Sequence, residues 1–243
     1  MNKLLPLALL PLFLLSCKKD KAPVTVPVEF KSTSYTNLQP FDTTGRPITM
    51  DTPDVISSGL TSFLNASLPE HVNLATAHPE LLASAAVADI KITQTSSLDV
   101  TFVSEGTQFT NAIAFYTYPT NSPPASAADI KTINYIFADA GYKTPLTKGD
   151  KVNIGTFNAG TSVGFVLMKG AWDLTNHTLN NGAVHFCSND VLNPEVDPAL
   201  KKHAVLLNYA PENRTLIGFE DIDRTNQYCD NDFNDVVIYI TVK

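Results

Sequence analysis

The sequence predicts a mainly β protein, an antiparallel β-sandwich or jelly-roll-like domain with a short helical segment on its N-terminal side. Two observations indicate this fold class. From residue 90 onward, about ten short runs rich in β-branched and aromatic residues follow one another, separated by Gly, Pro, Asn and Asp turns. Long amphipathic helices do not alternate with these runs, which argues against a parallel α/β sheet.

Each run has the length of a strand and is bounded by turn residues. In chain order the runs cover residues 89–95, 98–105, 111–119, 132–140, 150–157, 162–170, 182–188, 203–210, 214–222 and 235–242. The even spacing of these runs is typical of a sandwich. We therefore assign residues 90–243 to one β-sandwich domain.

Residues 51–89 have a different pattern, and we expect them to form a short helical segment that packs on the β domain. Apolar residues recur there at helical spacing, namely Val55, Ile56, Leu60, Phe63 and Leu64. Asp54 precedes them and is a candidate N-cap. A second short helix is expected over residues 79–88.

The start of the chain has the features of a bacterial lipoprotein signal peptide. Lys3 precedes an apolar run that is too short to span a membrane, and the run ends in LLSC at Cys17. We expect residues 1–16 to be removed and Cys17 to be lipidated; an ordinary signal peptide with a chance cysteine is the alternative. Lys18 fits sorting to the outer membrane, where the protein would face the periplasm or the cell exterior.

Residues 17–50 are predicted to be a flexible tether between this lipid anchor and the folded domain. After Cys17 they continue with KKDKAPVTVPVEFKSTSYTNLQP, which is rich in Lys, Pro, Ser and Thr. Such a composition does not bury enough apolar surface to pack. The KKDK start is similar to the tethers of Bacteroidetes lipoproteins.

The charge of the chain argues against nucleic acid as a partner. The formal net charge is -7 and the pI is near 5.1. Lys and Arg do not gather into the basic patch that phosphate binding requires.

Two cysteines remain after Cys17, namely Cys187 and Cys229. In an oxidising compartment an even pair favours a disulfide, and two free buried thiols are the alternative. Zinc binding is disfavoured because the sequence has no paired Cys or His spacing.

Acidic residues gather on both sides of the sequence RTNQYC, before the last apolar run. The candidate metal ligands are Glu220, Asp221, Asp223, Asp230, Asp232, Asn234 and Asp235. The Asp-x-Asp-x-Asn spacing starts like a calcium loop, but Asp235 and Thr241 stand where an EF-hand has Gly and Glu. An all-oxygen ligand set outside the cytoplasm favours Ca2+ in a site that is not an EF-hand.

Two other interpretations of these acids stay open. Asp and Asn side chains also form turns by accepting bonds from nearby backbone N–H groups, without any metal. Catalysis by carboxylates is the other alternative. Phe219 and Phe233 are expected to point inward and to anchor the acidic segments to the core.

The segment LIGFEDIDRTNQYCDNDFNDVVIYI resembles the signature of a bacterial exported domain of unknown function, found in cell-surface and adhesin-like proteins. Other segments, such as SLPEHVNL and KGDKVNIGTFNAGTSVGFVLMKGAW, resemble the LruC-domain lipoproteins, and the likeness spans residues 60–242. It departs from the pattern at Cys229 and at EGTQFTNAIAFYTY. The resemblance implies an exported β domain and no settled activity.

Three competing sites are weighed against this interpretation. The GTSVG stretch at residues 160–164 matches a nucleophile elbow, but an apolar strand-like run follows it where a helix is required. The histidines have no metal-binding pairing, and His185 and His203 are expected to be core or edge residues. A glycoside hydrolase would need two carboxylates across a cleft, for which Glu105 and Glu220 are candidates.

Aromatic residues suggest a place for a ligand. Tyr116 and Tyr118 lie in AFYTYP, and Trp172 lies in the polar turn KGAWDLTNH. Exposed rings beside polar groups are common in binding surfaces, so these three residues are candidate contacts for a glycan or a peptide. The alternative is that Trp172 closes one end of the sandwich.

Together these features predict a non-enzymatic lipoprotein of the cell envelope, stabilised by Ca2+, that binds an extracellular glycan or a surface protein in adhesion or envelope assembly. A hydrolase acting on envelope or extracellular polysaccharide is the alternative function.

Overall fold

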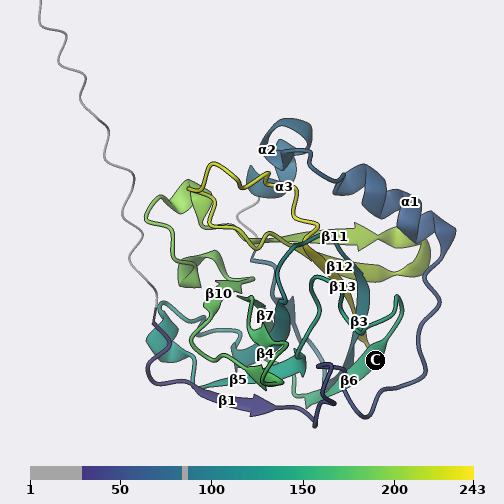
Figure 1. Ribbon diagram of the computed structural model, residues 1–243, viewed down its shortest axis with the longest axis vertical. Helices are drawn as coiled ribbons and strands as arrows, with labels where there is room; N and C mark the ends of the chain where they lie inside the picture. The colour runs from purple at the N-terminus through teal and green to yellow at the C-terminus, as the bar shows by residue number, and fades with distance from the viewer. Residues whose placement is uncertain (1–28, 84–86) are drawn as a thin grey trace, which may run out of the picture.

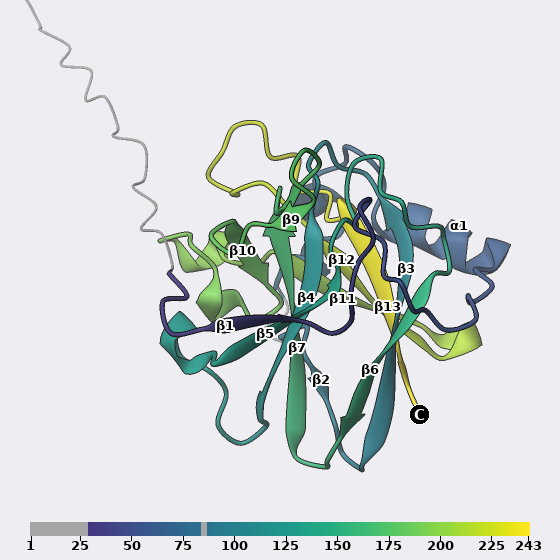
Figure 2. The ribbon, with the colours of Figure 1, turned by 60° about the horizontal axis from the view of Figure 1, so that its bottom comes forward.

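The computed structural model describes residues 29–83 and 87–243, so the predicted signal peptide and its lipidation residue Cys17 lie outside the described residues. Two β-sheets lie side by side, β4 and β7 in one and β3 and β13 in the other (Figure 1, Figure 2). The mainly β, antiparallel class predicted from the sequence is confirmed.

The first sheet has the strand order β1-β5-β4-β7-β10, and β2 also pairs with β7. Its strands are β1 (Ser34–Asn37), β2 (Ile90–Lys91), β4 (Ala112–Pro119), β5 (Thr132–Phe137), β7 (Thr161–Lys169) and β10 (Val184–Cys187). All neighbours are antiparallel except β1, which runs parallel to β5.

The second sheet has the order β11-β12-β13-β3-β6 and is antiparallel throughout. Its strands are β3 (Ser96–Glu105), β6 (Lys151–Phe157), β11 (Ala204–Tyr209), β12 (Arg214–Phe219) and β13 (Val236–Val242). A small hairpin, β8 (Trp172–Asp173) with β9 (Thr178–Leu179), stands apart from both sheets.

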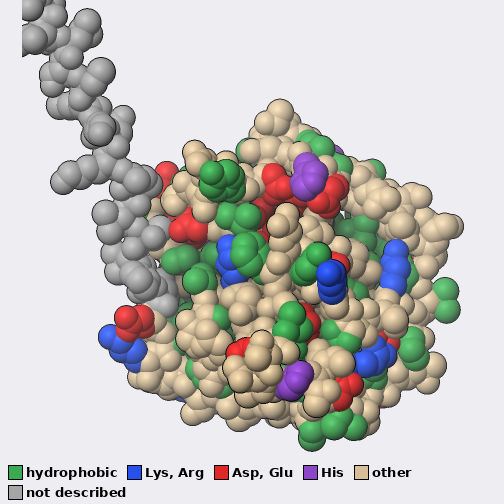
Figure 3. Space-filling model, viewed as in Figure 1, with side chains coloured by type: hydrophobic (Ala, Val, Ile, Leu, Met, Phe, Trp, Pro, Cys, Tyr) green, Lys and Arg blue, Asp and Glu red, His purple; other side chains and the backbone are tan. Residues whose placement is uncertain are grey.

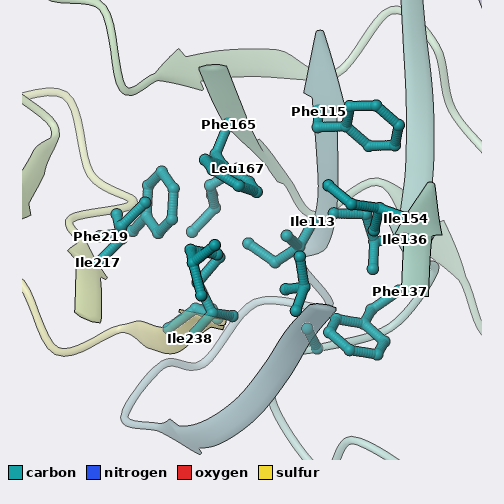
Figure 4. Packing of buried hydrophobic residues seen from close by; sticks show 14 of the residues in the cluster. Ile113, Phe115, Ile136, Phe137, Ile154, Phe165, Leu167, Ile217, Phe219 and Ile238 are labelled. Carbon is teal, nitrogen blue, oxygen red and sulfur yellow. The ribbon is translucent and has the colours of Figure 1, made fainter. Parts of the chain in front are cut away.

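The main core fills the space between the two sheets. Figure 4 shows Ile113 and Leu167 of the first sheet pointing toward Ile217 and Ile238 of the second. Successive residues of a strand face opposite sides, so Val237 and Tyr239 belong to a different cluster on the outer side of the second sheet. A further cluster covers the outer side of the first sheet, so central strands such as β4, β7 and β13 are buried on both faces and have little polar alternation.

Three helices cover the outer side of the second sheet beside β11 and β12 (Figure 1). They are α1 (Ser58–Ser67), α2 (Leu74–Ala77) and α3 (Pro79–Ala83). Leu60 and Leu64 of α1 pack there with Leu216 and Tyr239 of the sheet. None of the helices in the described residues is long and apolar enough to cross a bilayer.

The N-cap of α1 differs from the prediction. Ser57 is the cap, and its side chain accepts from the amide of Leu60 at 3.0 Å. The carboxylate of Asp54 instead accepts from Lys151 at 2.8 Å and from the hydroxyls of Thr101 and Tyr239. Asp54 thus ties the chain before the helix to the second sheet.

The tether predicted for residues 17–50 is wrong over residues 29–50. Phe30 is 9% exposed and packs outside the first sheet, and β1 adds a strand to that sheet's edge. Arg46 forms an ion pair with Asp150 whose shorter contact is 2.5 Å. The polar composition misled the prediction because an edge strand needs backbone pairing rather than many apolar side chains.

Within the described residues, single-turn 3-10 helices complete the connections: η1 (Ala127–Asp129), η2 (Asp190–Leu192), η3 (Pro198–Leu200) and η4 (Ala210–Glu212). η1 and η2 lie on the outer side of the first sheet, where Ala127 and Leu192 join the cluster around Tyr116. The GTSVG stretch enters β7 directly, as predicted, and is not an elbow before a helix.

Candidate metal centre

The acidic residues meet because β12 and β13 are antiparallel neighbours. β12 ends at Phe219 and β13 begins at Val236, and these two residues are paired in the sheet. Glu220 and Asp221 continue from the first strand, while Asp235 precedes the second. The amide of Asp221 donates to Oδ2 of Asp235 at 2.7 Å, so the two strand ends bring these acids together.

Five of the predicted ligands form two groups that could each hold a cation. The inner group is Glu220, Asp221 and Asp235, and the outer group is Glu220, Asp230 and Asp232. Within each group, one ligand atom from each residue lies within 4.8 Å of the others. Glu220 belongs to both groups, and carboxylate oxygens are the ligands that Ca2+ prefers.

These carboxylates are buried without enough partners. Glu220 and Asp221 are 0% exposed, Asp232 is 2% and Asp235 is 8% exposed. Among the described residues, Oε2 of Glu220 and Oδ1 of Asp221 have no hydrogen-bond donor. Within residues 29–83 and 87–243 no Lys or Arg forms an ion pair with the five acids. Buried charge of this kind requires protonation or a cation.

The pKa values reflect the same crowding. Burial raises the pKa of Glu220, Asp221 and Asp235, and the negative charges of neighbouring acids raise the pKa of each further. Burial raises the pKa of Asp232 to about 6, with a smaller contribution from Asp230. A bound divalent cation would reverse these shifts, because it favours the charged form of every carboxylate around it.

One oxygen of Asp221 is fixed by neighbours, which leaves the other free. The hydroxyl of Thr107 and the side-chain amide of Asn111 both donate to Oδ2 of Asp221. Both donors come from the loop between β3 and β4, next to the acidic loop. The carboxylate is thereby held in one orientation, with Oδ1 available as a ligand.

The loop between the two strands is bent sharply. Asn231 and Phe233 have φ values of 58° and 59°, a left-handed conformation that is costly for a bulky residue such as Phe. The ring of Phe233 is fully buried, as predicted, and so is that of Phe219, so packing holds the loop in place. Gly218 allows the close approach, since a Cβ there would lie 2.4 Å from the carbonyl oxygen of Phe233.

The two remaining predicted ligands, Asp223 and Asn234, make hydrogen bonds of their own. Asp223 accepts from the amide and hydroxyl of Thr225 at 2.8 and 2.7 Å, so it forms a turn, as the metal-free alternative anticipated. Asn234 donates to the carbonyl of Leu68 at 3.3 Å, and its Oδ1 is buried without a donor among the described residues. Asn234 thus joins the acidic loop to the loop after α1, and its backbone amide also donates to Asp232 at 3.2 Å.

Sequence reasoning missed a third group, composed of Glu70, His71 and Asp232. The loop between α1 and α2 carries the first two residues, and the amide of His71 donates to Oδ2 of Asp232 at 2.8 Å. Figure 3 shows acidic side chains beside a histidine over the region of α2 and α3. The sequence gives little signal for this group, because the helical segment also contains other titratable residues, among them Asp54, His78 and Glu80.

The two histidines in strand-like runs are buried, as predicted. His203 is 0% exposed and lies between the carbonyl of Glu220, at 2.8 Å, and the carboxylate of Glu195, at 2.6 Å. His185 contacts the hydroxyl of Tyr35 at 2.8 Å. His203 therefore holds the backbone of Glu220 rather than serving as a ligand.

The two carboxylates considered for a hydrolase do not share a pocket. Glu105 lines a pocket of about 370 Å³ together with Glu70 and Asn234. Glu220 does not line it and is fully buried.

The predicted disulfide between Cys187 and Cys229 is not formed, and both thiols are free. Cys187 ends β10 and is buried on the outer side of the first sheet with Ala112 and Tyr116. Cys229 lies in the acidic loop after β12, where burial and then the charge of Glu220 raise the pKa of its thiol. An even count had suggested a pair, but the fold places the two residues in separate surroundings.

The aromatic candidates for ligand contact are mostly buried, which corrects the predicted exposure. Tyr116 is 0% exposed and Trp172 is 4% exposed. Tyr118 donates from its hydroxyl to Asp89 at 2.7 Å. Trp172 nevertheless lines a groove of about 340 Å³ with Tyr35, Phe41, Tyr135, His177 and Asn181.

Comparison with known proteins gives one match. No curated protein and no solved structure matches the chain. The family match begins at the end of β6 and takes in β7 to β13, so it includes every acid of the inner and outer groups but neither Glu70 nor His71. Residues 157–243 match the model of a family described as Domain of unknown function (DUF4114).

Proposed function

We propose that this protein is a calcium-stabilised, non-catalytic lipoprotein of the bacterial cell envelope that binds an extracellular glycan or another surface protein. The observation that carries the proposal is the buried acidic cluster, in which Glu220 and Asp221 each keep an oxygen without a donor among the described residues. A divalent cation would neutralise these carboxylates and join the ends of β12 and β13.

The location rests on the sequence. The lipobox-like LLSC ending at Cys17 and the following Lys18 suit an outer-membrane lipid anchor, on the periplasmic or the exterior side. The resemblance to LruC-domain lipoproteins of the Bacteroidetes type is part of this proposal and fits the same location. The partners would then be the membrane, through the lipid, and a ligand outside the cytoplasm.

Binding fits the geometry better than hydrolysis. Glu105 lines a pocket that Glu220 does not line. Glu220 is 0% exposed, so in the described part of the chain its carboxylate is not accessible to a polysaccharide. The groove beside β1 offers side chains suited to a neutral sugar instead: the rings of Tyr35 and Phe41 and the amides of Asn37 and Asn181.

The test of the calcium site is thermal unfolding of the full-length chain in EDTA, in magnesium and in micromolar to millimolar calcium. A ligand that binds only the native state adds RT ln(1 + [L]/Kd), which is about 2.7 kcal/mol at a hundredfold excess over Kd. We expect Tm to rise with calcium by several degrees and to respond less to magnesium. Asp232→Asn should reduce the calcium-dependent rise in Tm. Asp223→Asn, which alters a turn outside both groups, should leave that rise unchanged.

Equal Tm values in EDTA and calcium, together with no calcium in elemental analysis of the purified chain, would refute the site. The buried acids would then be protonated at neutral pH, and the stability of the chain would fall as pH rises.

A further inference from the structure

The five acids of the candidate metal centre divide into two sets rather than forming one. Glu220 groups with Asp221 and Asp235 on one side and with Asp230 and Asp232 on the other. No group of four or five of these acids meets the same 4.8 Å limit within residues 29–83 and 87–243. The separation matters because it sets how many cations the cluster accommodates.

The limit follows from calcium coordination. Ca2+–oxygen distances are about 2.3–2.6 Å, so two oxygens on one ion lie at most about 5 Å apart, when they are on opposite sides of it. Each group of three satisfies this condition, and the five together do not. One ion in this geometry reaches either the inner or the outer group, and the other group is left without one.

Each group also contains a buried oxygen that lacks a partner. Asp221, whose Oδ1 has no donor among the described residues, belongs to the inner group alone, and Glu220, whose Oε2 has none, belongs to both groups. Both side chains are 0% exposed. Because the second oxygen of Asp221 is held by Thr107 and Asn111, the free oxygen does not turn away to find another donor.

The balance of charge agrees. One divalent cation in the outer group leaves the inner acids Asp221 and Asp235 buried and uncompensated. Lys169 lies over the ring of Phe109 and forms no ion pair with these acids within the described part of the chain. Two divalent cations neutralise four of the five carboxylates, which removes most of the cost of burying them.

We infer that the cluster is a two-cation site, in which the carboxylate of Glu220 bridges one calcium ion in the inner group and a second in the outer group. This inference rests on the proposed calcium function and adds its stoichiometry. The outer ion is bound partly by Asp230, which is only half-buried, whereas the ligands of the inner ion are all buried. The two ions should therefore differ in their rate of exchange with solvent.

The test is native mass spectrometry of the full-length chain after equilibration with calcium and removal of free ion, with elemental analysis as a second count. We expect two calcium ions per chain in the wild type. Asp230→Asn should leave one ion, Asp235→Asn should leave one, and Glu220→Gln should weaken both. The control Asp223→Asn should retain two.

The outcomes separate the inference from the proposed function. One ion in the wild type, lost equally in Asp230→Asn and Asp235→Asn, would overturn the pair while leaving calcium binding intact. No ion in the wild type would overturn both. Circular dichroism checks that each variant is folded, and Asp221→Asn replaces Asp235→Asn as the inner-group variant if the latter does not fold.

Discussion

At the scale of single residues, burial separates acids that look alike in the sequence. Asp221 and Asp223 are two positions apart, yet the first is fully buried with a free oxygen and the second is half-buried and accepts hydrogen bonds within a turn. Asp89, outside the metal centre, is another buried acid: it is 7% exposed, and its carboxylate accepts hydrogen bonds from the hydroxyls of Ser188 and Tyr118. Spacing identified where acids gather, and the surroundings decide what each does.

Asp89 makes stability depend on pH in a predictable direction. Burial raises its pKa from 3.8 to about 6, so between these values the folded chain holds a proton that the unfolded chain has released. The free energy of unfolding should therefore fall as pH rises from about 4 to about 6, by on the order of 3 kcal/mol from this residue. Asp89→Asn should remove that part of the slope.

The measurement is the free energy of urea unfolding of wild type and Asp89→Asn in EDTA, at intervals between about pH 4 and pH 7. This range covers the interval over which the shifted pKa of Asp89 changes stability. The metal centre then contributes equally and cancels in the difference. Parallel pH profiles for the two proteins would show that Asp89 ionises normally in the folded state.

At the scale of elements, the short strands β1, β8 and β9 show that strand pairing stabilises segments whose side-chain pattern does not predict a strand. Each of the ten predicted strand-like runs overlaps a strand of the structure, whereas the sequence did not predict β1, β8 or β9. The unanticipated strands have four residues or two residues each, so their side chains give almost no period. Their pairing partners, which lie far away in the sequence, stabilise them.

Hydrogen exchange should distinguish a paired β1 from a tether. The amide of Ser34 donates to the carbonyl of Lys131 at 2.9 Å, and that of Leu38 donates to the carbonyl of Tyr135 at 3.1 Å. We expect both amides to exchange much more slowly than the amide of Thr43, which lies in an exposed turn. Exchange of all three at the same unprotected rate would restore the tether prediction for this segment.

At the scale of the whole molecule, the groove beside β1 is assembled from segments far apart in the chain. Tyr35 and Phe41 come from the N-terminal segment, Tyr135 from β5, and Trp172 and His177 from the β8–β9 hairpin. The hydroxyl of Tyr135 donates to Oδ1 of Asn181 at 2.9 Å, which orients that amide at the rim. A binding surface at this groove therefore forms only when the N-terminal segment, β5 and the β8–β9 hairpin are folded together.

Glycan binding at this groove has a built-in reporter, because Trp172 is the only tryptophan of the chain. We expect neutral oligosaccharides that bind on a glycan array in calcium to change the fluorescence of the full-length chain. Asn181→Ala should weaken binding about tenfold, the effect of losing roughly one hydrogen bond. Asn158→Ala, in an exposed turn away from the groove, is the matched control. Binding that is unaffected by Asn181→Ala would place the glycan elsewhere.

The sequence by itself determined the mainly β class, the positions of the longer strands, the inward direction of Phe219 and Phe233, and the segment in which acids gather. These features depend on local composition and on a period of two residues, both of which are visible in one chain. Tertiary structure decided the rest. Pairing of Phe219 with Val236 brought two acidic segments together. Other tertiary contacts placed Glu70 and His71 beside Asp232, left Cys187 and Cys229 as free thiols, and buried Trp172. Each of these depends on contacts between residues distant in the chain, which spacing along the sequence does not encode.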